Sequence, residues 1–169
     1  MELYRCRICG EPGFGTELPS HCPCCGARRP HLALALDYEP TVLDELSSKS
    51  RENLERLVEL STETSGFFRG ASKVADQAEG KVLFSVLAQV EARHVTIICS
   101  LLGMESPEEL QAPGECSPAH KENVAEARKR LERNLNLDRR FLDEAVEERI
   151  RQVLVAFIDT ATDELAFIL

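Results

Sequence analysis

The pattern of hydrophobic and polar positions divides the chain into two regions near residue 35. After residue 40, Leu, Val, Ile and Ala recur every three or four residues, which is the spacing of one face of an α-helix. Four such segments follow one another, so we expect four helices, at about 41–74, about 81–102, from near Pro118 onward, and over the final stretch of the chain. Residues 1–32 lack this periodicity and hold four of the nine glycines and four of the eight prolines.

Each predicted helix carries an apolar stripe that would face a shared core, and Phe67 and Phe68 are expected in that core. The inward positions include Leu54, Leu57, Val58, Ser61, Thr64, Ser65, Phe68, Ala71; Leu83, Val86, Leu87, Val90, Glu91, His94, Ile97, Ile98, Leu101; Val124, Ala127, Leu131, Asn134, Leu135, Asp138, Phe141, Leu142, Ala145; and Ile150, Val153, Leu154, Phe157, Ala161, Glu164, Leu165, Ile168. A turn over Asp76–Gly80 separates the first two helices. No Gly or Pro marks the turn between the last two, so it is placed near Glu147–Arg149, with Asn136–Asp138 as the alternative.

The two halves of the helical region resemble each other. Leu54–Leu101 aligns with Leu131–Leu169, and placing Val90 on Thr160 sets Glu91 on Ala161 and His94 on Glu164. Two helix pairs joined by a long crossover are typical of a ferritin-like four-helix bundle. We therefore expect a mostly α protein with two domains, a small module at 1–35 and a ferritin-like bundle at 36–169, and with Pro40 near the first turn of the first helix.

Five of the seven cysteines lie within the first 25 residues. Four of them form two Cys-x-x-Cys-Gly motifs, Cys6–Cys9 and Cys22–Cys25, twelve residues apart. Two such turns present four thiolates in tetrahedral geometry, which suits iron or zinc, and the spacing leaves Cys24 facing away. A tight cluster of this kind, behind an N-terminus without a charged-then-apolar signal, predicts a cytoplasmic protein. The isolated Cys99 and Cys116 are expected to be inert thiols.

Composition and charge narrow the choice of partners. The chain is 43% hydrophobic, enough for a real core, and its formal net charge is −9. That charge argues against nucleic acid or an anionic membrane surface as the main partner. No apolar run approaches the roughly 20 residues of a membrane span, so no membrane association is expected.

Glu91 and His94 stand three residues apart on the inward stripe of the second helix, where apolar residues are expected. Burying either group without a partner is costly. The pair therefore indicates either metal ligation or a hydrogen-bonded network in the core, and the pattern leaves both open.

Residues 4–32 resemble the short rubredoxin-like module of rubrerythrins. The resemblance rests on the twelve-residue gap, the Cys-Pro-x-Cys pair, and His31 with Leu32 six residues further on. With a ferritin-like bundle attached, the whole chain resembles a rubrerythrin whose cysteine module comes first. The resemblance implies a rubredoxin-type Fe(Cys)₄ centre that passes single electrons, with zinc possible in its place. It also implies a homodimer, a redox partner protein, and a bundle that in active members holds two irons and reduces hydrogen peroxide.

The sequence departs from that family at the bundle site. A di-iron carboxylate site takes a Glu from each of two helices and Glu-x-x-His from each of the other two. Only Glu91 and His94 form this motif, and Ser61, Asn134 and Ala161 stand at other ligand positions. The candidate ligands that remain for a metal in the bundle are Glu91, His94 and Glu164, with Asp138 as a further candidate.

Three functions stay open from the sequence. The first is a rubrerythrin-like redox protein, which if active is a peroxidase-like oxidoreductase contributing to oxidative stress defence. The second is a non-enzymatic, zinc-stapled helical bundle that binds another protein and has a decayed di-iron site. The third is metal storage or sensing through a single bundle site.

Overall fold

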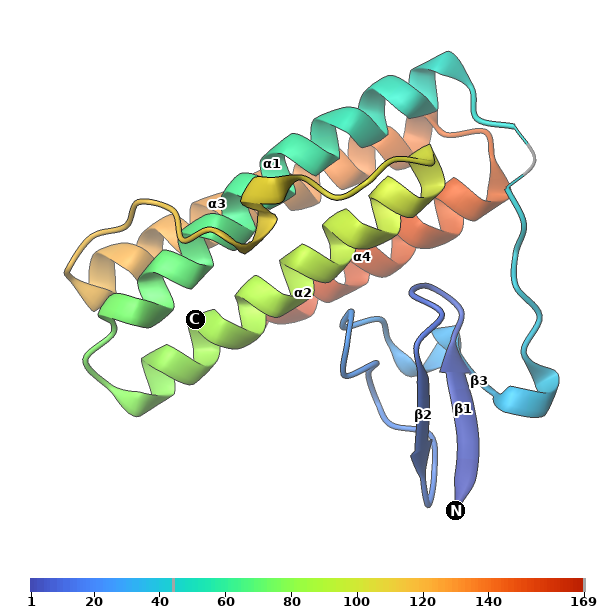
Figure 1. Ribbon diagram of the computed structural model, residues 1–169, viewed down its shortest axis with the longest axis horizontal. Helices are drawn as coiled ribbons and strands as arrows, with labels where there is room; N and C mark the ends of the chain where they lie inside the picture. Colours follow the sequence, from blue (N-terminus) through green and yellow to red (C-terminus); the bar gives the residue numbers. More distant parts are fainter. Residues whose placement is uncertain (44, 169) are drawn as a thin grey trace.

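The computed structural model describes residues 1–43 and 45–168. Four long helices lie side by side (Figure 1), and they are α1 (Ser48–Val74), α2 (Ala78–Leu102), α3 (His120–Glu144) and α4 (Glu148–Phe167). A small sheet precedes them, so the prediction of a mostly helical chain with a small N-terminal module is confirmed. Asp44 and Leu169, which fall within the predicted domain 36–169, lie outside the described residues.

The helix boundaries correct the sequence prediction in three places. Helix α1 begins at Ser48 instead of about residue 41, because the Ser47 side chain caps it by accepting from the Ser50 amide at 3.2 Å. Pro40 is therefore outside the first turn. Helix α2 begins three residues earlier than predicted. The break between α3 and α4 falls at 145–147, near the preferred position, and the alternative at 136–138 is wrong because those residues lie inside α3.

Helices α1 and α2 form one antiparallel pair, and α3 and α4 form the other. The connection between the pairs, residues 103–119, contains a 3₁₀ turn, η3 (Glu108–Gln111), and runs back along α1. Glycines allow this close approach. The Gly114 amide donates to the Gly66 carbonyl at 2.7 Å, and a Cβ on Gly70 would lie 2.2 Å from the Gly114 oxygen.

The predicted inward stripes form the core, with Phe67 and Phe68 buried as expected. Val86 is exposed at 51% of its surface, and six further stripe residues are only half-buried: Leu83, Leu101, Val124, Leu142, Glu164 and Leu165. Ser61, Glu91, His94, Asn134 and Asp138 are all buried polar residues. The middle of the helical region is therefore polar, as the stripes indicated.

Among the described residues, α2 is long and apolar enough to cross a membrane by length and composition. This differs from the expectation that no apolar run approaches the length of a membrane span. The observation carries little weight, because 61% of the relevant stretch is buried inside the structure, as in the core helices of water-soluble proteins.

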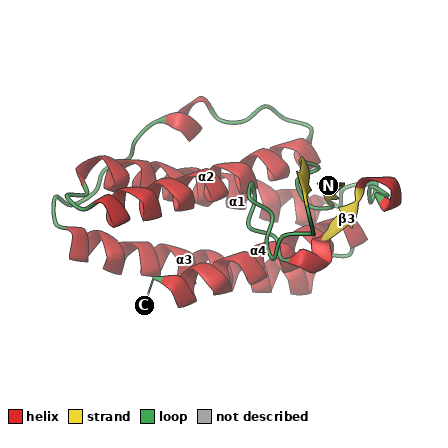
Figure 2. Cartoon of the chain, turned by 90° about the horizontal axis from the view of Figure 1, so that it is seen from below, coloured by secondary structure: helices red, strands yellow, loops and turns green. Residues whose placement is uncertain are grey.

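The N-terminal module is a three-stranded antiparallel sheet in the order β2-β1-β3, built from β1 (Glu2–Cys6), β2 (Pro12–Gly15) and β3 (Leu32–Leu34). Two 3₁₀ turns, η1 (Arg29–His31) and η2 (Ala35–Asp37), flank β3. Figures 1 and 2 show that the module lies against the helices. This placement brings the cysteine turns next to α2 and α4.

Candidate metal centre

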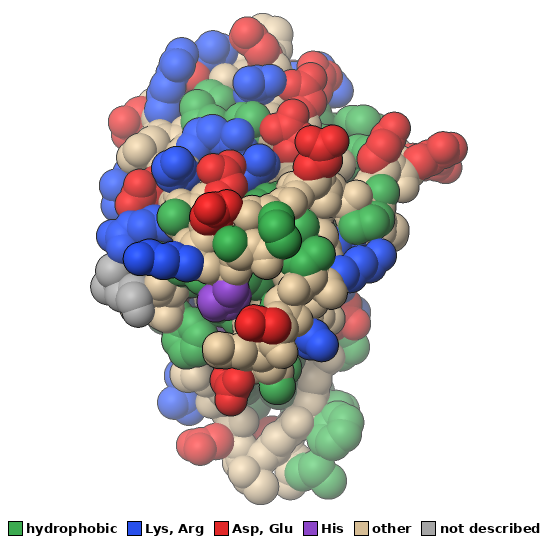
Figure 3. All heavy atoms as spheres, turned by 90° about the vertical axis from the view of Figure 1, so that its left-hand side faces the viewer, with side chains coloured by type: hydrophobic (Ala, Val, Ile, Leu, Met, Phe, Trp, Pro, Cys, Tyr) green, Lys and Arg blue, Asp and Glu red, His purple; other side chains and the backbone are tan. Residues whose placement is uncertain are grey.

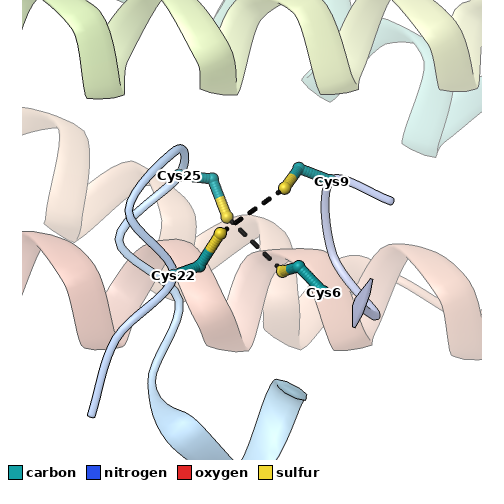
Figure 4. Close-up of side chains that lie close together, drawn as sticks. All are labelled: Cys6, Cys9, Cys22 and Cys25. Carbon is teal, nitrogen blue, oxygen red and sulfur yellow. Dashed lines mark hydrogen bonds between the residues drawn. The ribbon is translucent and has the colours of Figure 1, made fainter. Parts of the chain in front are cut away.

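The sulfur atoms of Cys6, Cys9, Cys22 and Cys25 converge on one point from two loops (Figure 4). All four lie within 4.8 Å of one another, and the Cys6–Cys25 and Cys9–Cys22 sulfur pairs are each 3.7 Å apart. A tetrahedral metal with metal–sulfur bonds of about 2.3 Å requires sulfurs about 3.8 Å apart. The four cysteines could therefore hold a metal ion such as iron or zinc.

The two cysteine turns have the same backbone geometry. The Gly10 amide donates to the Cys6 carbonyl at 2.9 Å, and the Gly26 amide donates to the Cys22 carbonyl at 3.0 Å. Both glycines are left-handed, with φ of 72° and 75°. That conformation costs other residues about 1–2 kcal/mol, which explains the glycine after each second cysteine.

The electrostatics of the cluster favour a bound cation. Hydrogen bonding with Cys25 lowers the pKa of Cys22, and the same interaction raises the pKa of Cys25. The protons are thus shared unequally among neighbouring sulfurs that repel one another when ionised. A divalent or trivalent cation removes that repulsion and binds the thiolates directly.

The remaining thiols lie outside the cluster. Cys24 is partly exposed and is absent from the converging group, which agrees with the prediction that it faces away. Cys99 is buried and Cys116 is partly exposed. The structure thus separates the four candidate ligands from the three other cysteines.

Side chains from the helices hold the cysteine turns. The Arg149 guanidinium donates to the Arg7 and Ile8 carbonyls at 2.7 Å each. His94 Nε2 lies 2.9 Å from the Cys25 carbonyl oxygen. The second turn packs tightly as well, since a Cβ on Gly26 would lie 2.5 Å from the Thr160 methyl group.

The role of His94 follows from that contact. A carbonyl oxygen only accepts, so Nε2 carries the hydrogen and donates it. Burial lowers the pKa of His94 to about 4, so the ring is neutral near pH 7 and its Nδ1 carries no hydrogen. The ring also stacks on Phe157 with centroids 3.9 Å apart. His94 is thus fixed in one orientation with one tautomer.

A second cluster lies in the middle of the helices, and we call it the carboxylate cavity. Its lining residues come from all four helices: Leu57, Ser61, Glu91, His94, Ile98, Asn134, Asp138, Phe157, Ala161 and Glu164. The free volume is about 10 Å³, room for one water molecule or one ion. The structure thus brings the predicted residues Glu91, His94, Asp138 and Glu164 together around one small space.

Burial favours the protonated form of each acid in the carboxylate cavity. Burial raises the pKa of Glu91 to about 7 against hydrogen bonds from Ser61 and Asn134 that lower it. Burial, and then the charge of Glu91, raise the pKas of Asp138 and Glu164 well above their usual values. Among the described residues, Glu91 Oε2 is a buried oxygen without a hydrogen-bond partner. An unpartnered oxygen facing so small a space fits one bound ion or water.

The same residues do not fit a di-iron centre. Ser61, Asn134 and Ala161 occupy the positions where that centre requires carboxylates, and the free space is too small for two metals and a bridging ligand. The donors present fit one ion at most. A histidine that ligates a metal commonly donates its other ring N–H to a backbone carbonyl, as His94 does.

Sequence reasoning missed the residues that join the two regions. Arg149 was assigned only to a turn, and no local pattern indicated that it would reach carbonyls of the first cysteine turn. Arg28 pairs with Asp159 and Asp163 on α4 in the same way. Such contacts depend on how the regions dock, so no local sequence pattern marks them.

Fold and site together define a helical protein with a small N-terminal sheet and a four-cysteine site that could hold a metal. Comparisons of this chain with family models, with curated proteins and with solved structures found no match. Its resemblance to rubrerythrins therefore stays a prediction carried by the motifs themselves.

Proposed function

We propose that this protein is a rubrerythrin-like redox protein of ferritin-like fold, in which the four-cysteine site carries iron and transfers single electrons. An iron ion bound there supplies a ferric/ferrous couple. The four converging sulfurs support this proposal, since they suit iron as well as zinc.

The observation that carries the proposal is the hydrogen bond from His94 Nε2 to the Cys25 carbonyl, 2.9 Å long. Cys25 is a candidate ligand of the cysteine site, and His94 lines the carboxylate cavity. A short route of covalent bonds and one hydrogen bond thus runs from the cysteine site to the cavity. The route lies within one chain, so it needs no second subunit. The homodimer and the redox partner protein remain part of the proposal.

Peroxide reduction is the reaction that the resemblance to rubrerythrins implies. One hydrogen peroxide takes up two electrons and two protons and gives two water molecules. Each four-cysteine centre supplies one electron, so two reduced chains are consumed per peroxide. Burial raises the pKas of Asp138 and Glu164, which makes these carboxyl groups suited to supplying the protons.

A second function has its own support. Ser61, Asn134 and Ala161 leave the cavity short of ligands, which favours a zinc-stapled helical bundle that binds another protein. Metal identity distinguishes the two. A ferric four-cysteine centre is red and zinc is colourless, so visible absorption and metal analysis of protein from its native source decide between them. Zinc alone in that sample would exclude electron transfer.

The His94 route is tested in iron-loaded protein that is first reduced and then mixed with hydrogen peroxide. The return of the red colour measures electron loss. His94→Phe should slow that return at least tenfold, while His94→Gln, which keeps an N–H donor, should recover part of the rate. His120→Phe is the matched control and should leave it unchanged. Equal rates in all four proteins would show that electrons leave by another route.

A further inference from the structure

Arg149 carries a positive charge into the contact between α4 and the first cysteine turn. Its guanidinium donates to the carbonyls of Arg7 and Ile8 at 2.7 Å each. These two residues lie between the two candidate metal ligands of that turn. The third acceptor is the side-chain oxygen of Gln152, also at 2.7 Å. All three acceptors are uncharged, so none of them balances the charge of the guanidinium.

Two other arginines that join the module to the helices have carboxylate partners. Arg28 pairs with two aspartates of α4, and Arg93 pairs with Glu11. Figure 3 shows a similar pattern on one end of the molecule, where basic side chains lie among acidic ones. Within residues 1–43 and 45–168, no ion pair involves Arg149. Arg149 therefore differs from its two neighbours in lacking a counter-charge from a side chain.

The position of Arg149 makes an unbalanced charge costly. Its side chain is half-buried, and burial lowers the pKa of the guanidinium against the charges of Tyr38, Cys6 and Cys9, which raise it. An arginine nevertheless stays protonated at neutral pH. A half-buried cation is stabilised by a nearby negative group. The cysteine site is such a group when it holds a metal.

The charge of the cysteine site depends on the metal and on its oxidation state. Four thiolates around ferric iron carry one net negative charge, and around ferrous iron or zinc they carry two. Coulomb attraction grows with the product of the two charges, so a nearby guanidinium is attracted more strongly to the ferrous site than to the ferric one. Because Arg149 belongs to α4, the same attraction draws the first cysteine turn toward that helix.

We propose that Arg149 is the counter-charge of the cysteine site, favouring the reduced state of a bound iron and holding the first cysteine turn more firmly on α4 when that iron is reduced. The inference rests on the proposed redox function, because it concerns the same site. Reduction adds one electron from the redox partner protein to ferric iron, and no proton or bond is exchanged. Linkage makes the two effects equal in free energy, so each predicts the other. Arg149 is thus a positioning residue that acts through its charge.

The first test is a redox titration of iron-loaded protein with dithionite and mediators, followed by the loss of the red ferric absorption. Arg149→Gln keeps an N–H donor and removes the charge. It should lower the equilibrium constant for reduction threefold to tenfold, which is about 30–60 mV for one electron. Arg149→Lys keeps the charge and should stay within twofold of wild type. Equal shifts in both variants would overturn the inference, because hydrogen-bond geometry would then be the cause.

Arg151→Gln is the matched control. Arg151 lies two residues further along α4 and also donates to two backbone carbonyls, those of Leu142 and Ala145, which belong to the helical region. Removing its charge should change the equilibrium constant less than twofold. The inference fails if Arg151→Gln shifts the constant as much as Arg149→Gln, because the net charge of the chain would then account for the effect. It also fails if Arg149→Gln behaves as wild type.

The second test uses wild-type protein alone, so it remains decisive if the Arg149 variants fail to fold. Amide hydrogen exchange is compared between ferric and ferrous samples. Residues 6–10 should exchange threefold to tenfold more slowly in the ferrous sample. Residues 22–26 are the internal control, because the second cysteine turn has the same backbone geometry and an arginine already paired with carboxylates. They should gain less protection.

Equal gains in the two turns, or no gain in either, would overturn the inference. Both tests use iron loaded in vitro, so their outcome is separate from that of the redox proposal. Zinc alone in protein from its native source would exclude the redox proposal. Unchanged potentials in a red, iron-loaded Arg149→Gln protein would exclude only the role of Arg149.

Discussion

The cysteine site and the carboxylate cavity are joined by one hydrogen bond, yet they differ in how complete they are. The cysteine site has four like ligands converging at tetrahedral spacing. The cavity has three acids, one histidine and several positions without a charged ligand. The first is built by two local turns, each of which sets two ligands at once. The second needs every helix to contribute separately, so ligands can be lost one at a time while the helices still pack.

The cysteine site and the carboxylate cavity affect the stability of the fold in opposite directions. A metal bound by four cysteines stabilises a small module that has little core of its own. Buried carboxyl groups destabilise the helices once they ionise, because charge is costly in the interior. Removing a cysteine ligand should therefore destabilise the module, and removing a buried acid should stabilise the helices.

The largest effect is expected at the cysteine site. Cys22→Ser leaves three thiolates, so we expect loss of stoichiometric metal and of protection against amide hydrogen exchange in β1, β2 and β3. Structural metals of this type contribute about 10–16 kcal/mol in small domains, more than a sheet of this size can replace. Metal analysis and hydrogen exchange measure the two losses.

Cys24→Ser is the matched control for that experiment, because Cys24 is the neighbouring thiol that does not converge on the site. It should keep full metal content and full protection. If Cys24→Ser loses metal as Cys22→Ser does, the assignment of the four ligands is wrong.

The second prediction concerns the carboxylate cavity. The pKa of Glu91 rises from 4.5 to about 7 on folding, so the folded state keeps this proton longer than the unfolded state. The proton on Glu91 contributes roughly 3 kcal/mol to the free energy of unfolding. This contribution is complete below pH 4.5 and is lost as the pH rises through 7. Glu91→Gln removes that loss. In zinc-loaded protein, its stability relative to wild type should increase by about this amount between pH 4.5 and pH 7.5.

His94 contributes with the opposite sign, since its pKa falls from 6.5 to about 4. Its contribution is present above pH 6.5 and is lost as the pH falls through 4. In wild type, the pH dependences that Glu91 and His94 give to the free energy of unfolding oppose each other. The test is therefore the difference in the free energy of unfolding between wild type and Glu91→Gln. Urea unfolding followed by circular dichroism measures it. A difference that does not change with pH would show that folding leaves the pKa of Glu91 unchanged.

Local signals in the sequence predicted the four helices, the cysteine turns and the inward position of Glu91 and His94, because each depends on residues close together in the chain. The start of α1 was placed too early, since the Ser47 cap gave a weaker signal than Pro40. The partner of His94 could not be predicted. The Cys25 carbonyl is 69 positions away, and every residue carries a carbonyl, so no side-chain pattern marks the one that is used.

The smallest effect is expected where the N-terminal module contacts α4, and there Arg149 and Arg28 can be compared. Arg149 donates to two backbone carbonyls, and burial lowers its pKa, so no water replaces it readily. Arg149→Met should weaken the docking of the N-terminal module on the helices by about 2 kcal/mol, as expected for hydrogen bonds from a charged group. Faster hydrogen exchange at residues 6–10 should report this loss.

Arg28→Met provides the matched comparison, because Arg28 is also an arginine that joins the module to α4. Its side chain is 38% exposed and pairs with the carboxylates of Asp159 and Asp163. Exposed ion pairs contribute little and are screened by salt. Its effect should be smaller than that of Arg149→Met and should disappear at about 0.5 M salt, where the Debye length falls to a few ångströms. The Arg149→Met effect should persist there, because its partners are neutral carbonyls. If both effects vanish in salt, the module is held mainly by surface charge, and the His94 contact would then be too transient to carry electrons.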